Sequence, residues 1–420
     1  IGARPEEIFF TSSGTESNNF ALKGLAQANS QKGNHIIVSQ VEHFSVLHPV
    51  KSLEKSGFKV TQVAPDKQGL IDPEAVKKAI TKETVLVSIM HSNNEIGTLQ
   101  PIEEIGAITR EKGVLFHTDA VASVGWVPVD VQALGVDALS LSGHQFYGPK
   151  GTAALFVRKG VRIKPQIEGG VQEDGRRGGT EDVPGIVGLG KAAEIAAAEL
   201  PNRSSHLIPL RDKLLTGLQA RISDLIVNGH PTRRLPHNVN VSFLFVEGES
   251  MLLFLNMAGI YVSSGSACTS RSLKSSHVLS CIGTDAAAAK AVTGKARGER
   301  FFDLAIKSST GKAMKLSDMR GKVLLVHFWG TWCPPCRNEM PELQKLHQAL
   351  GGSSDIQLVL LQMREDYGTA SLWMGAQGFK LPLFDSGVAD AGSDTLSLSS
   401  GKQIRDRDLA TERAISSLGE

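Results

Sequence analysis

The stretch "DALSLSGHQFYGPKGTAALFVRKG", residues 137–160, contains two short apolar runs on either side of a glycine-rich turn. Each run has the length and the bounding turn residues of a buried β-strand. Similar runs precede it, separated by helix-length segments: "EIFFTSS", "NHIIVSQ", "FKVTQVAP", "TVLVSIMHS" and "GVLFHTDA". Strands that alternate with helices form βαβ units, so residues 8–156 predict an α/β fold with a mostly parallel sheet covered on both faces.

The composition is that of a globular protein with little net charge. Its 420 residues have room for two or three domains. Lys and Arg number 45 and Asp and Glu 43, so no net field favours nucleic acid or an anionic membrane, and a small-molecule substrate is expected. We find no apolar run of the roughly 18–20 residues that span a bilayer and no signal peptide, which predicts a cytoplasmic protein. Because the chain starts at Ile1 and enters a strand almost at once, we expect its N-terminus to be truncated.

Changes in composition predict the domain organisation. A first domain is expected over residues 1–283, with two further helical stretches between residues 185 and 222. Residues 284–300, "TDAAAAKAVTGKARGER", are small and basic without apolar periodicity and predict a linker. A second α/β domain is expected over residues 301–385. The polar, serine-rich residues 386–420 predict a poorly defined tail with one hairpin.

Three polar motifs follow predicted strands. "TSSGTESNN" places Gly14 and Thr15 at the start of a helix, where backbone amides and the threonine hydroxyl can bind a phosphate; a capping box is the alternative. Asp119 ends the strand in "HTDAV", at the carboxyl edge of the sheet where ligands bind, or it caps the next helix. The amides in "SNNEIG", residues 92–97, can bond a ring hydroxyl, or they build a turn.

The four cysteines indicate reactivity in a reducing compartment rather than a disulfide framework, because two stand alone and two form a CxxC motif. Cys268 lies in "SSGSACTS", whose small and polar residues suit an exposed, mobile loop and a reactive thiolate. An inert buried cysteine is the alternative. Cys281 has no such setting and is expected to be structural. No spacing in the sequence predicts a metal site.

The motifs GTES, VEHFSV, NNEIG, HTDA, SGHQFYGPKG, RGGTED and SSGSACTS follow one another in this order. With this pattern, residues 1–283 resemble the cysteine desulfurases, relatives of the class-V aminotransferases with the fold type I architecture of pyridoxal 5'-phosphate enzymes. The resemblance implies a homodimer that converts L-cysteine to L-alanine and holds the sulfur as a persulfide. The sulfur would pass to an acceptor protein for iron–sulfur cluster assembly or tRNA thiolation. Against this family, the domain is expected to be truncated at both ends.

The resemblance also implies where the cofactor binds. Thr15 would hold the phosphate with Ser142 and His144 beside it, and Thr180 would reach the phosphate of a partner subunit. The complete cofactor-binding set that it implies is Gly14, Thr15, His43, Asn94, Asp119, Ser142, His144, Gln145 and Thr180.

Catalytic roles follow from the same resemblance. His43 would stack on the pyridine ring, and Asn94 would contact the ring hydroxyl. Asp119 would pair with the ring nitrogen, because a carboxylate there keeps that nitrogen protonated and lets the ring accept carbanion electrons. Cys268 would be the acceptor whose thiolate attacks the sulfur of cofactor-bound cysteine.

The pattern departs from the family at its covalent position. Gln145 stands where the family has the lysine that forms the Schiff base and moves the α-proton, and an amide has neither a nucleophilic nitrogen nor a suitable pKa. Lys150 belongs to the ordinary turn of the motif and is not expected to replace it. Ala122 stands where the family usually has a glutamine that contacts the cofactor, a loss of roughly 1 kcal/mol of binding. The sequence therefore predicts a cofactor that is noncovalent or lost, and impaired desulfurase activity.

A second motif, "FWGTWCPPCRNEMPEL", ends a buried strand and opens a helix at Cys333. The helix N-terminus stabilises a thiolate there, and the two-residue spacing lets Cys336 close a disulfide onto it. Half of a zinc site is the alternative, but no second Cys or His pair lies near in the sequence. Residues 301–384 resemble the thioredoxin-like thiol–disulfide oxidoreductases. Against this family the domain is expected to be incomplete, because the strand with the family's cis-proline is not found after Asp385. In that resemblance Cys333 attacks, Cys336 resolves, and a thiol redox partner is implied.

Three hypotheses follow for the whole chain. The first is a cysteine desulfurase-like module fused to a thiol–disulfide redox module, with the CPPC motif reducing the persulfide on Cys268. The second is a thiol–disulfide oxidoreductase that carries an inactive scaffold of the pyridoxal-phosphate fold. The third is a chimeric fragment without activity.

Overall fold

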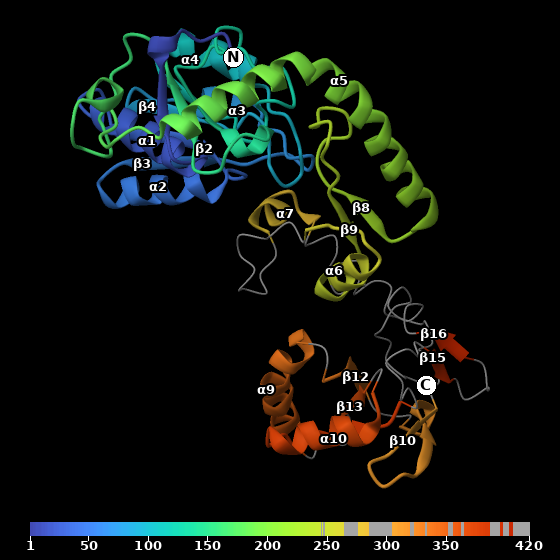
Figure 1. Ribbon diagram of the computed structural model, residues 1–420. Coiled ribbons are helices and arrows are strands. Elements are labelled where there is room, and N and C mark those ends of the chain that lie inside the picture. The colour runs from blue at the N-terminus through green and yellow to red at the C-terminus, as the bar shows by residue number, and fades with distance from the viewer. Residues whose placement is uncertain are drawn as a thin grey trace. The chain divides into compact units, whose positions relative to one another are not determined.

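The computed structural model describes residues 1–244, 246, 248–263, 276–284, 305–319, 323–331, 334–351, 356–362, 365–386, 395–397 and 403–405 (Figure 1). Cys268, Cys333 and the predicted linker after Thr284 lie outside the described residues. The chain divides into two compact units. Unit 1 comprises residues 1–242 and 265–286, and unit 2 comprises residues 243–264 and 287–420.

Unit 1 is built on a seven-stranded sheet in the order β1-β7-β6-β5-β4-β2-β3. β2 to β6 pair in parallel, whereas β7 runs antiparallel to both β6 and β1. The predicted α/β fold with a mostly parallel sheet is confirmed, and every predicted run forms a strand. Their bounds are β1 (Ile8–Thr11), β2 (His35–Ser39), β3 (Lys59–Val63), β4 (Thr84–Ser88), β5 (Leu115–Asp119), β6 (Ala138–Ser142) and β7 (Ala153–Val157).

Helices cover both faces of this sheet. β2, β4, β6 and β7 are buried at every residue, which explains their continuous apolar runs. One face packs against α1 (Gly14–Ala28) and α2 (Phe44–Lys55), whose buried side chains include Leu22, Leu25 and Val50. The other face packs against α3 (Pro73–Ala79), α4 (Ile102–Lys112), α7 (His277–Cys281) and the first half of α5 (Val183–Arg221) (Figure 1).

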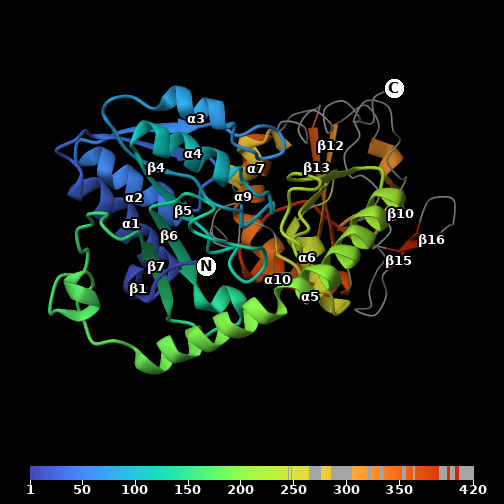
Figure 2. The same ribbon diagram turned by 90° about the horizontal axis from the view of Figure 1, so that it is seen from above.

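The two helical stretches predicted between residues 185 and 222 are one continuous helix, α5, of 39 residues. It contains Pro201 and Pro209, each of which removes one intrahelical hydrogen bond. Contacts elsewhere in unit 1 compensate for this loss: Leu189 and Ala192 pack in the core, and Arg211 donates to the carbonyl oxygen of Leu235 at 3.2 Å. The second half of α5 lies beside β8 (Leu225–Val227), which pairs with β9 (Val241–Phe243), as labelled in Figure 1. Figure 2 shows the length of α5 from above.

Unit 2 contains a three-stranded parallel sheet in the order β12-β13-β14. One face packs against the β10–β11 hairpin through Ile306 and Leu361, and the other packs against α9 and α10 through Met340 and Met374. The elements are α6 (Gly248–Met257), β10 (Ala305–Lys307), β11 (Ala313–Lys315), β12 (Val323–Trp329), α9 (Pro334–Ala349), β13 (Ile356–Gln362), α10 (Tyr367–Ala376), β14 (Leu383–Phe384), β15 (Thr395–Ser397) and β16 (Gln403–Arg405). β15 and β16 pair antiparallel, where the sequence predicts one hairpin in the tail.

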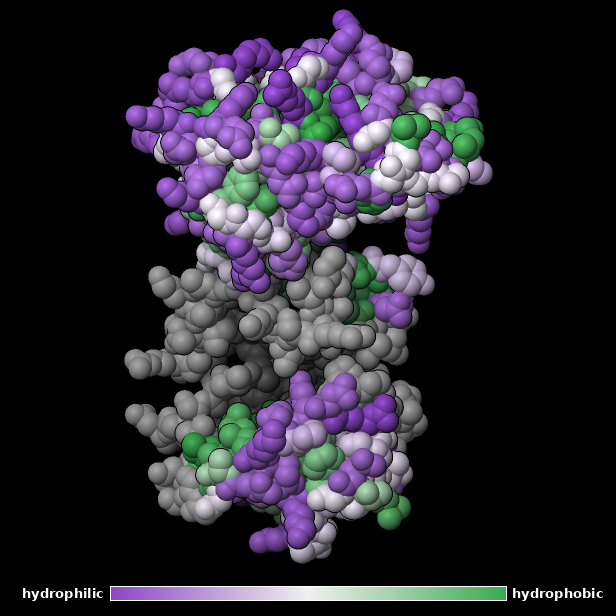
Figure 3. Space-filling view, turned by 90° about the vertical axis from the view of Figure 1, so that its left-hand side faces the viewer, coloured by the Kyte–Doolittle hydropathy of each residue, from purple (hydrophilic) through white to green (hydrophobic). Residues whose placement is uncertain are grey.

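On the face seen in Figure 3, the described surface of unit 1 is mainly hydrophilic, and apolar residues form small, scattered patches. Among the described residues, we find no helix with the length and apolarity to cross a bilayer.

We predict that Gly106→Ala lowers the stability of unit 1. A Cβ at this position of α4 would lie 2.2 Å from the backbone oxygen of Leu134, so the helix must shift, at a cost of roughly 1–3 kcal/mol. Gly190→Ala, on the exposed side of α5, is the matched control, because no atom lies within 4 Å of its added Cβ. Calorimetric unfolding should show a lower melting temperature for the first variant. The control should be unchanged or more stable, by up to about 1 kcal/mol, because alanine favours helices. Equal melting temperatures would contradict the predicted helix contact.

Candidate active site

Asp119 is the buried carboxylate at the carboxyl end of β5. It is 5% exposed, and its Oδ2 accepts a hydrogen bond from Asn18 Nδ2 at 2.7 Å. Its Oδ1 accepts from the backbone N–H of Val121 at 2.9 Å. Burial raises the pKa of Asp119, although these two hydrogen bonds act to lower it. The carboxylate is therefore oriented by donors on two elements at the edge where parallel sheets bind ligands.

Asn18 connects Asp119 to the start of α2. Its Nδ2 also donates to Ser45 Oγ at 2.8 Å, and Ser45 Oγ lies 2.7 Å from His43 Nδ1. Burial lowers the pKa of His43, although the charge of Asp119 acts to raise it, so the imidazole is neutral near pH 7. The Oδ1 atom of Asn18 is buried and has no hydrogen-bond partner among the described residues. An orphaned acceptor beside a carboxylate is typical of a binding site rather than of a packed core.

Gly14 brings the start of α1 against the ends of two strands. A Cβ on Gly14 would lie 2.7 Å from Val121 Cγ2 and 3.6 Å from Ser142 Cβ, so only glycine allows this approach. Ser13 caps the helix by accepting from the backbone N–H of Glu16 at 3.2 Å. Thr15 is exposed in the first turn, where the helix dipole favours an anion.

The turn after β6 is the 3₁₀ helix η2 (Gly143–Phe146). Ser142 Oγ lies 2.9 Å from His144 Nδ1, and His144 Nε2 lies 3.4 Å from Gln145 Nε2. His144 and Gln145 are both exposed, whereas Ser142 is buried. Trp126 Nε1 donates to the backbone oxygen of Gln145 at 2.9 Å and so fixes the turn.

The buried polar side chains behind Asp119 are neutral near pH 7. Burial raises the pKa of Glu42 to about 8, helped by the charge of Asp119, while hydrogen bonds from Ser39 and Met90 oppose the shift. Burial lowers the pKa of His91 to about 4 and that of His117 to about 3. Asp119 therefore lies among polar side chains that are neutral near pH 7.

An ion pair ties the loop that carries Thr180 to α1. Arg177 Nε donates to Glu16 Oε1 at 2.9 Å, and Glu16 Oε2 also accepts from the backbone N–H of Ser12 at 2.8 Å. Burial raises the pKa of Glu16, but the hydrogen bonds from Arg177 and Ser12 bring it below its ordinary value. Thr180 itself is exposed.

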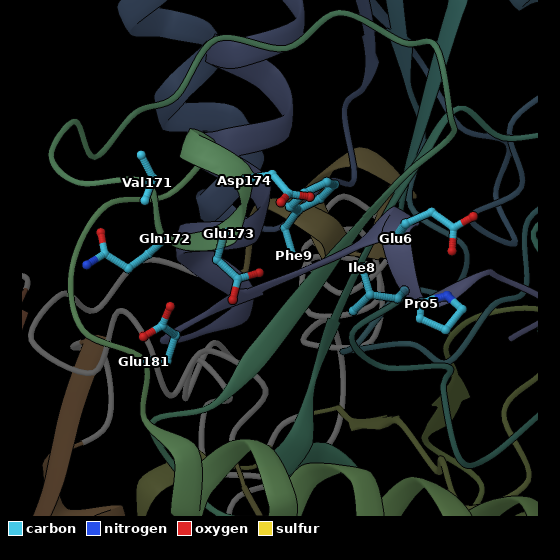
Figure 4. Close-up of a pocket in the computed structure, with 9 residues that line it drawn as sticks. All are labelled: Pro5, Glu6, Ile8, Phe9, Val171, Gln172, Glu173, Asp174 and Glu181. Carbon is cyan, nitrogen blue, oxygen red and sulfur yellow. The ribbon is translucent and has the colours of Figure 1, made fainter.

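The same loop forms one wall of a pocket of about 400 Å³ beside β1. Figure 4 shows Glu173, Asp174 and Glu181 on this wall and Ile8 and Phe9 on the side of β1. Glu173 Oε2 accepts from the backbone N–H of Phe10 at 2.9 Å. No group of three metal-ligating side chains occurs among the described residues, and this acidic pocket has no feature that points to a ligand.

The structure does not bring every predicted site residue to Asp119. Asn94 is exposed and makes no side-chain hydrogen bond among the described residues, while its neighbour Asn93 builds the turn by accepting from the backbone N–H of Ile96. Lys150 is exposed in the turn after η2. Cys281 is half-buried, and burial raises the pKa of its thiol, which agrees with a structural role.

In unit 2, Cys336 lies in the first turn of α9 and is disulfide-bonded. The turn before this helix is held by Glu365, whose carboxylate accepts from the backbone N–H of Thr331 at 2.8 Å and from its hydroxyl. His327 Nε2 is buried, has no hydrogen-bond partner within the described part of the chain, and lies 3.9 Å from Glu339 Oε2. The sequence reading missed Glu365 and Glu339, because their contacts join segments that are separate in the chain.

Comparison with known proteins identifies the first module. Residues 1–283 match the family model "Aminotransferase class-V", and we call these residues the class-V module. The chain belongs to the class-V aminotransferase family. "Cysteine desulfurase IscS" of Methanosarcina thermophila is 56% identical to the class-V module, over 67% of this chain and 70% of the relative. The protein of the same name from Dictyoglomus turgidum is 55% identical, over 67% of this chain and 72% of the relative.

A solved structure and a second family model complete the comparison. The structure titled "NIFS-LIKE PROTEIN" matches with a TM-score of 0.63 at 41% identity, over 67% of this chain and 74% of that one. Residues 297–390 match the "AhpC/TSA family". The resemblance of the class-V module to cysteine desulfurases and of the second module to thioredoxin-like proteins is confirmed.

The class-V module fits pyridoxal 5'-phosphate at two of its three anchoring points. The buried carboxylate of Asp119 suits a protonated ring nitrogen, and the glycine-lined helix start at Gly14 suits a phosphate. The third point does not fit, because Gln145 has no amine that can bond to the aldehyde. Among the described residues, no lysine hydrogen-bonds to Asp119, Ser142, His144 or Gln145.

We predict that Glu42→Gln stabilises the protein increasingly as the pH rises. The folded protein keeps the proton on Glu42 up to about pH 8, whereas in the unfolded chain the carboxyl ionises near 4.5. The parent protein therefore loses stability between pH 5 and pH 8, by up to about 1.4 kcal/mol per pH unit, and the neutral amide removes this loss. Denaturant unfolding at several pH values measures the difference. The exposed Glu54→Gln serves as the control. A difference between Glu42→Gln and the parent that does not change with pH would show that Glu42 is ionised in the folded state.

Proposed function

We propose that the class-V module binds pyridoxal 5'-phosphate noncovalently and has lost most of the cysteine desulfurase turnover of its relatives. The observation that carries this proposal is the buried Asp119, oriented by Asn18 and backed by neutral groups, next to the helix start at Gly14. The absence of an amine at Gln145 supports the loss of turnover. L-Cysteine remains the proposed substrate and Cys268, outside the described residues, the proposed sulfur acceptor.

The residues of the module have separate proposed roles. Asp119 would hold the proton of the ring nitrogen, and the neutral imidazole of His43 would face the ring. The first turn of α1, with Gly14 and Thr15, would bind the phosphate together with Ser142. When bound, the cofactor supplies an electron sink for the carbanion at the substrate α-carbon.

Gln145 limits the chemistry that this arrangement can perform. Its amide neither takes a proton from a substrate nor returns one, and general acid–base catalysis contributes about 10²–10⁴-fold to such steps. His43 is hydrogen-bonded to Ser45 and oriented by it, so its Nδ1 is already engaged. We therefore propose binding without efficient turnover.

For the second module we propose thiol–disulfide exchange at the CPPC motif. The Cys333 thiolate would attack a partner disulfide, break its S–S bond and form a mixed disulfide, and the first partner thiolate would leave and take up a proton. Cys336 would then lose its proton and attack Cys333, which closes the internal disulfide and releases the partner thiolate to take up a proton. Two electrons pass to the partner in the process. The disulfide-bonded state of Cys336 and its place at the start of α9 support this proposal.

The family relationship supports two further proposals. The relatives imply a homodimer in which Thr180 serves the site of a partner subunit, and its exposed position on the loop tied to α1 is compatible with that role. We also retain the cytoplasm as the proposed location.

We predict that the purified chain binds pyridoxal 5'-phosphate without a covalent bond and releases no measurable sulfide from L-cysteine. Borohydride treatment followed by mass spectrometry should find no cofactor attached at the site. Asp119→Asn should weaken binding at least about tenfold, since it removes a charged partner of the ring nitrogen. Sulfide release at a rate within about a hundredfold of that of the Gln145→Lys variant would contradict the assigned effect of Gln145.

We predict that the reduced protein reduces insulin disulfides through Cys333. Cys333→Ser should abolish the reaction, because the attacking thiolate is removed. Cys336→Ser should instead accumulate a mixed disulfide that mass spectrometry can detect. Cys281→Ser is the matched control and should react like the parent. Full activity in Cys333→Ser would exclude the proposed role of the CPPC motif.

A further inference from the structure

The first turn of α1 carries an acidic side chain, Glu16, beside the proposed position of the phosphate. Glu16 lies two residues after Gly14, the first residue of the helix. Its Oε2 accepts from the backbone N–H of Ser12 at 2.8 Å, so the carboxylate turns back toward the start of the helix. A carboxylate at this place interacts with the helix dipole that would also attract a phosphate, and it repels that phosphate.

The cap of α1 leaves two backbone donors for a ligand. Ser13 Oγ accepts from the N–H of Glu16 at 3.2 Å, and the backbone oxygen of Ser13 accepts from the N–H of Ser17 at 3.0 Å. The backbone N–H groups of Gly14 and Thr15 have no acceptor among the described residues. A phosphate bound by these two donors would therefore lie within one helical turn of the Glu16 carboxylate.

Arg177 compensates the charge of Glu16. Its Nε donates to Glu16 Oε1 at 2.9 Å, and its Nη2 donates to Glu16 Oε2 at 3.4 Å. The side chains of Arg177 and Glu16 are only 22% and 16% exposed, so solvent screens the pair incompletely. Burial acts to raise the pKa of Glu16, but the hydrogen bonds from Arg177 and Ser12 bring it below its ordinary value. Both partners are therefore charged near pH 7.

Within the described part of the chain, Glu16 forms an ion pair with Arg177 alone. The neighbouring Arg176 is engaged elsewhere, since its guanidinium lies 4.6 Å from the centre of the Phe9 ring. The other charged residues between positions 172 and 182 are acidic: Glu173, Asp174, Glu181 and Asp182. Without Arg177, the phosphate end of the site would face the uncompensated charge of Glu16.

We propose that Arg177 sets the affinity of the class-V site for the phosphate group of its ligand by compensating the charge of Glu16. This inference rests on the proposed cofactor site and names a residue that controls its phosphate end. Arg177 is a positioning residue, because its guanidinium is held by the Glu16 carboxylate and acts through it. A purely structural alternative is that the ion pair only fastens the loop to α1.

Isothermal titration calorimetry of the full chain with pyridoxine 5'-phosphate tests the proposal. This ligand has no aldehyde and cannot bond to surface lysines. Arg177→Met should raise the dissociation constant at least about threefold, because it leaves a carboxylate uncompensated in the first turn of α1. Arg176→Met is the matched control, since it removes the same charge from the adjacent residue. Its dissociation constant should stay within about twofold of that of the parent.

Glu16→Gln separates the charge from the structural role. The amide oxygen can still accept from the backbone N–H of Ser12, but the negative charge is gone. Charge compensation by Arg177 then predicts tighter binding, with a dissociation constant at least about threefold lower, because the guanidinium is left without its anion. A pair that only fastens the loop predicts weaker binding instead. The double variant Glu16→Gln/Arg177→Met should bind with about the affinity of the parent.

The outcomes are distinguishable. If the parent chain does not bind pyridoxine 5'-phosphate, the proposed cofactor site fails and the role of Arg177 fails with it. If the parent binds, equal affinity in Arg177→Met or weaker binding in Glu16→Gln would overturn the role of Arg177 and leave the site intact. A double variant as weak as Arg177→Met would show that Arg177 does not act through Glu16. Should Arg177→Met fail to fold by circular dichroism, the Glu16→Gln comparison decides by itself.

Discussion

The hydrogen bond between Asn18 and Asp119 joins the two elements on which the first module depends. Asp119 ends β5, and Asn18 lies one turn into α1, so one amide brings the helix start to the carboxyl edge of the sheet. Gly14 makes this approach sterically possible, since Val121 occupies the space of its missing side chain. The fold thereby places the start of α1 and a carboxylate at the same edge of one sheet.

Burial gives this carboxylate its distinct character. Glu42, His91 and His117 are all within the core, and desolvation holds each of them in its neutral form near pH 7. A carboxylate in such surroundings interacts strongly with a cation that binds beside it, because a low dielectric screens the attraction weakly. Gln145 is exposed in the turn after β6, and its amide is uncharged, so this side chain supplies no cation to the carboxylate.

The second module uses a different arrangement of polar groups around a reactive turn. Glu365 comes from the segment after β13 and binds both the amide and the hydroxyl of Thr331, directly before the CPPC motif. His327 lies on the strand that leads into this turn, with its Nε2 buried near Glu339. Buried polar groups without full partners are costly, and they concentrate where a protein performs chemistry.

The sequence by itself determined the α/β class, the strand positions, the CPPC motif and the absence of an amine at position 145, because each is a local pattern of residue types. Only the tertiary structure revealed Asn18, Glu42 and Glu365 as partners of the reactive groups, and it joined the two predicted stretches before residue 222 into α5. Those features depend on contacts between segments distant in the chain. A local pattern of residue types does not specify which distant side chain completes a hydrogen bond. It also does not specify which contacts offset the intrahelical hydrogen bond that a proline removes.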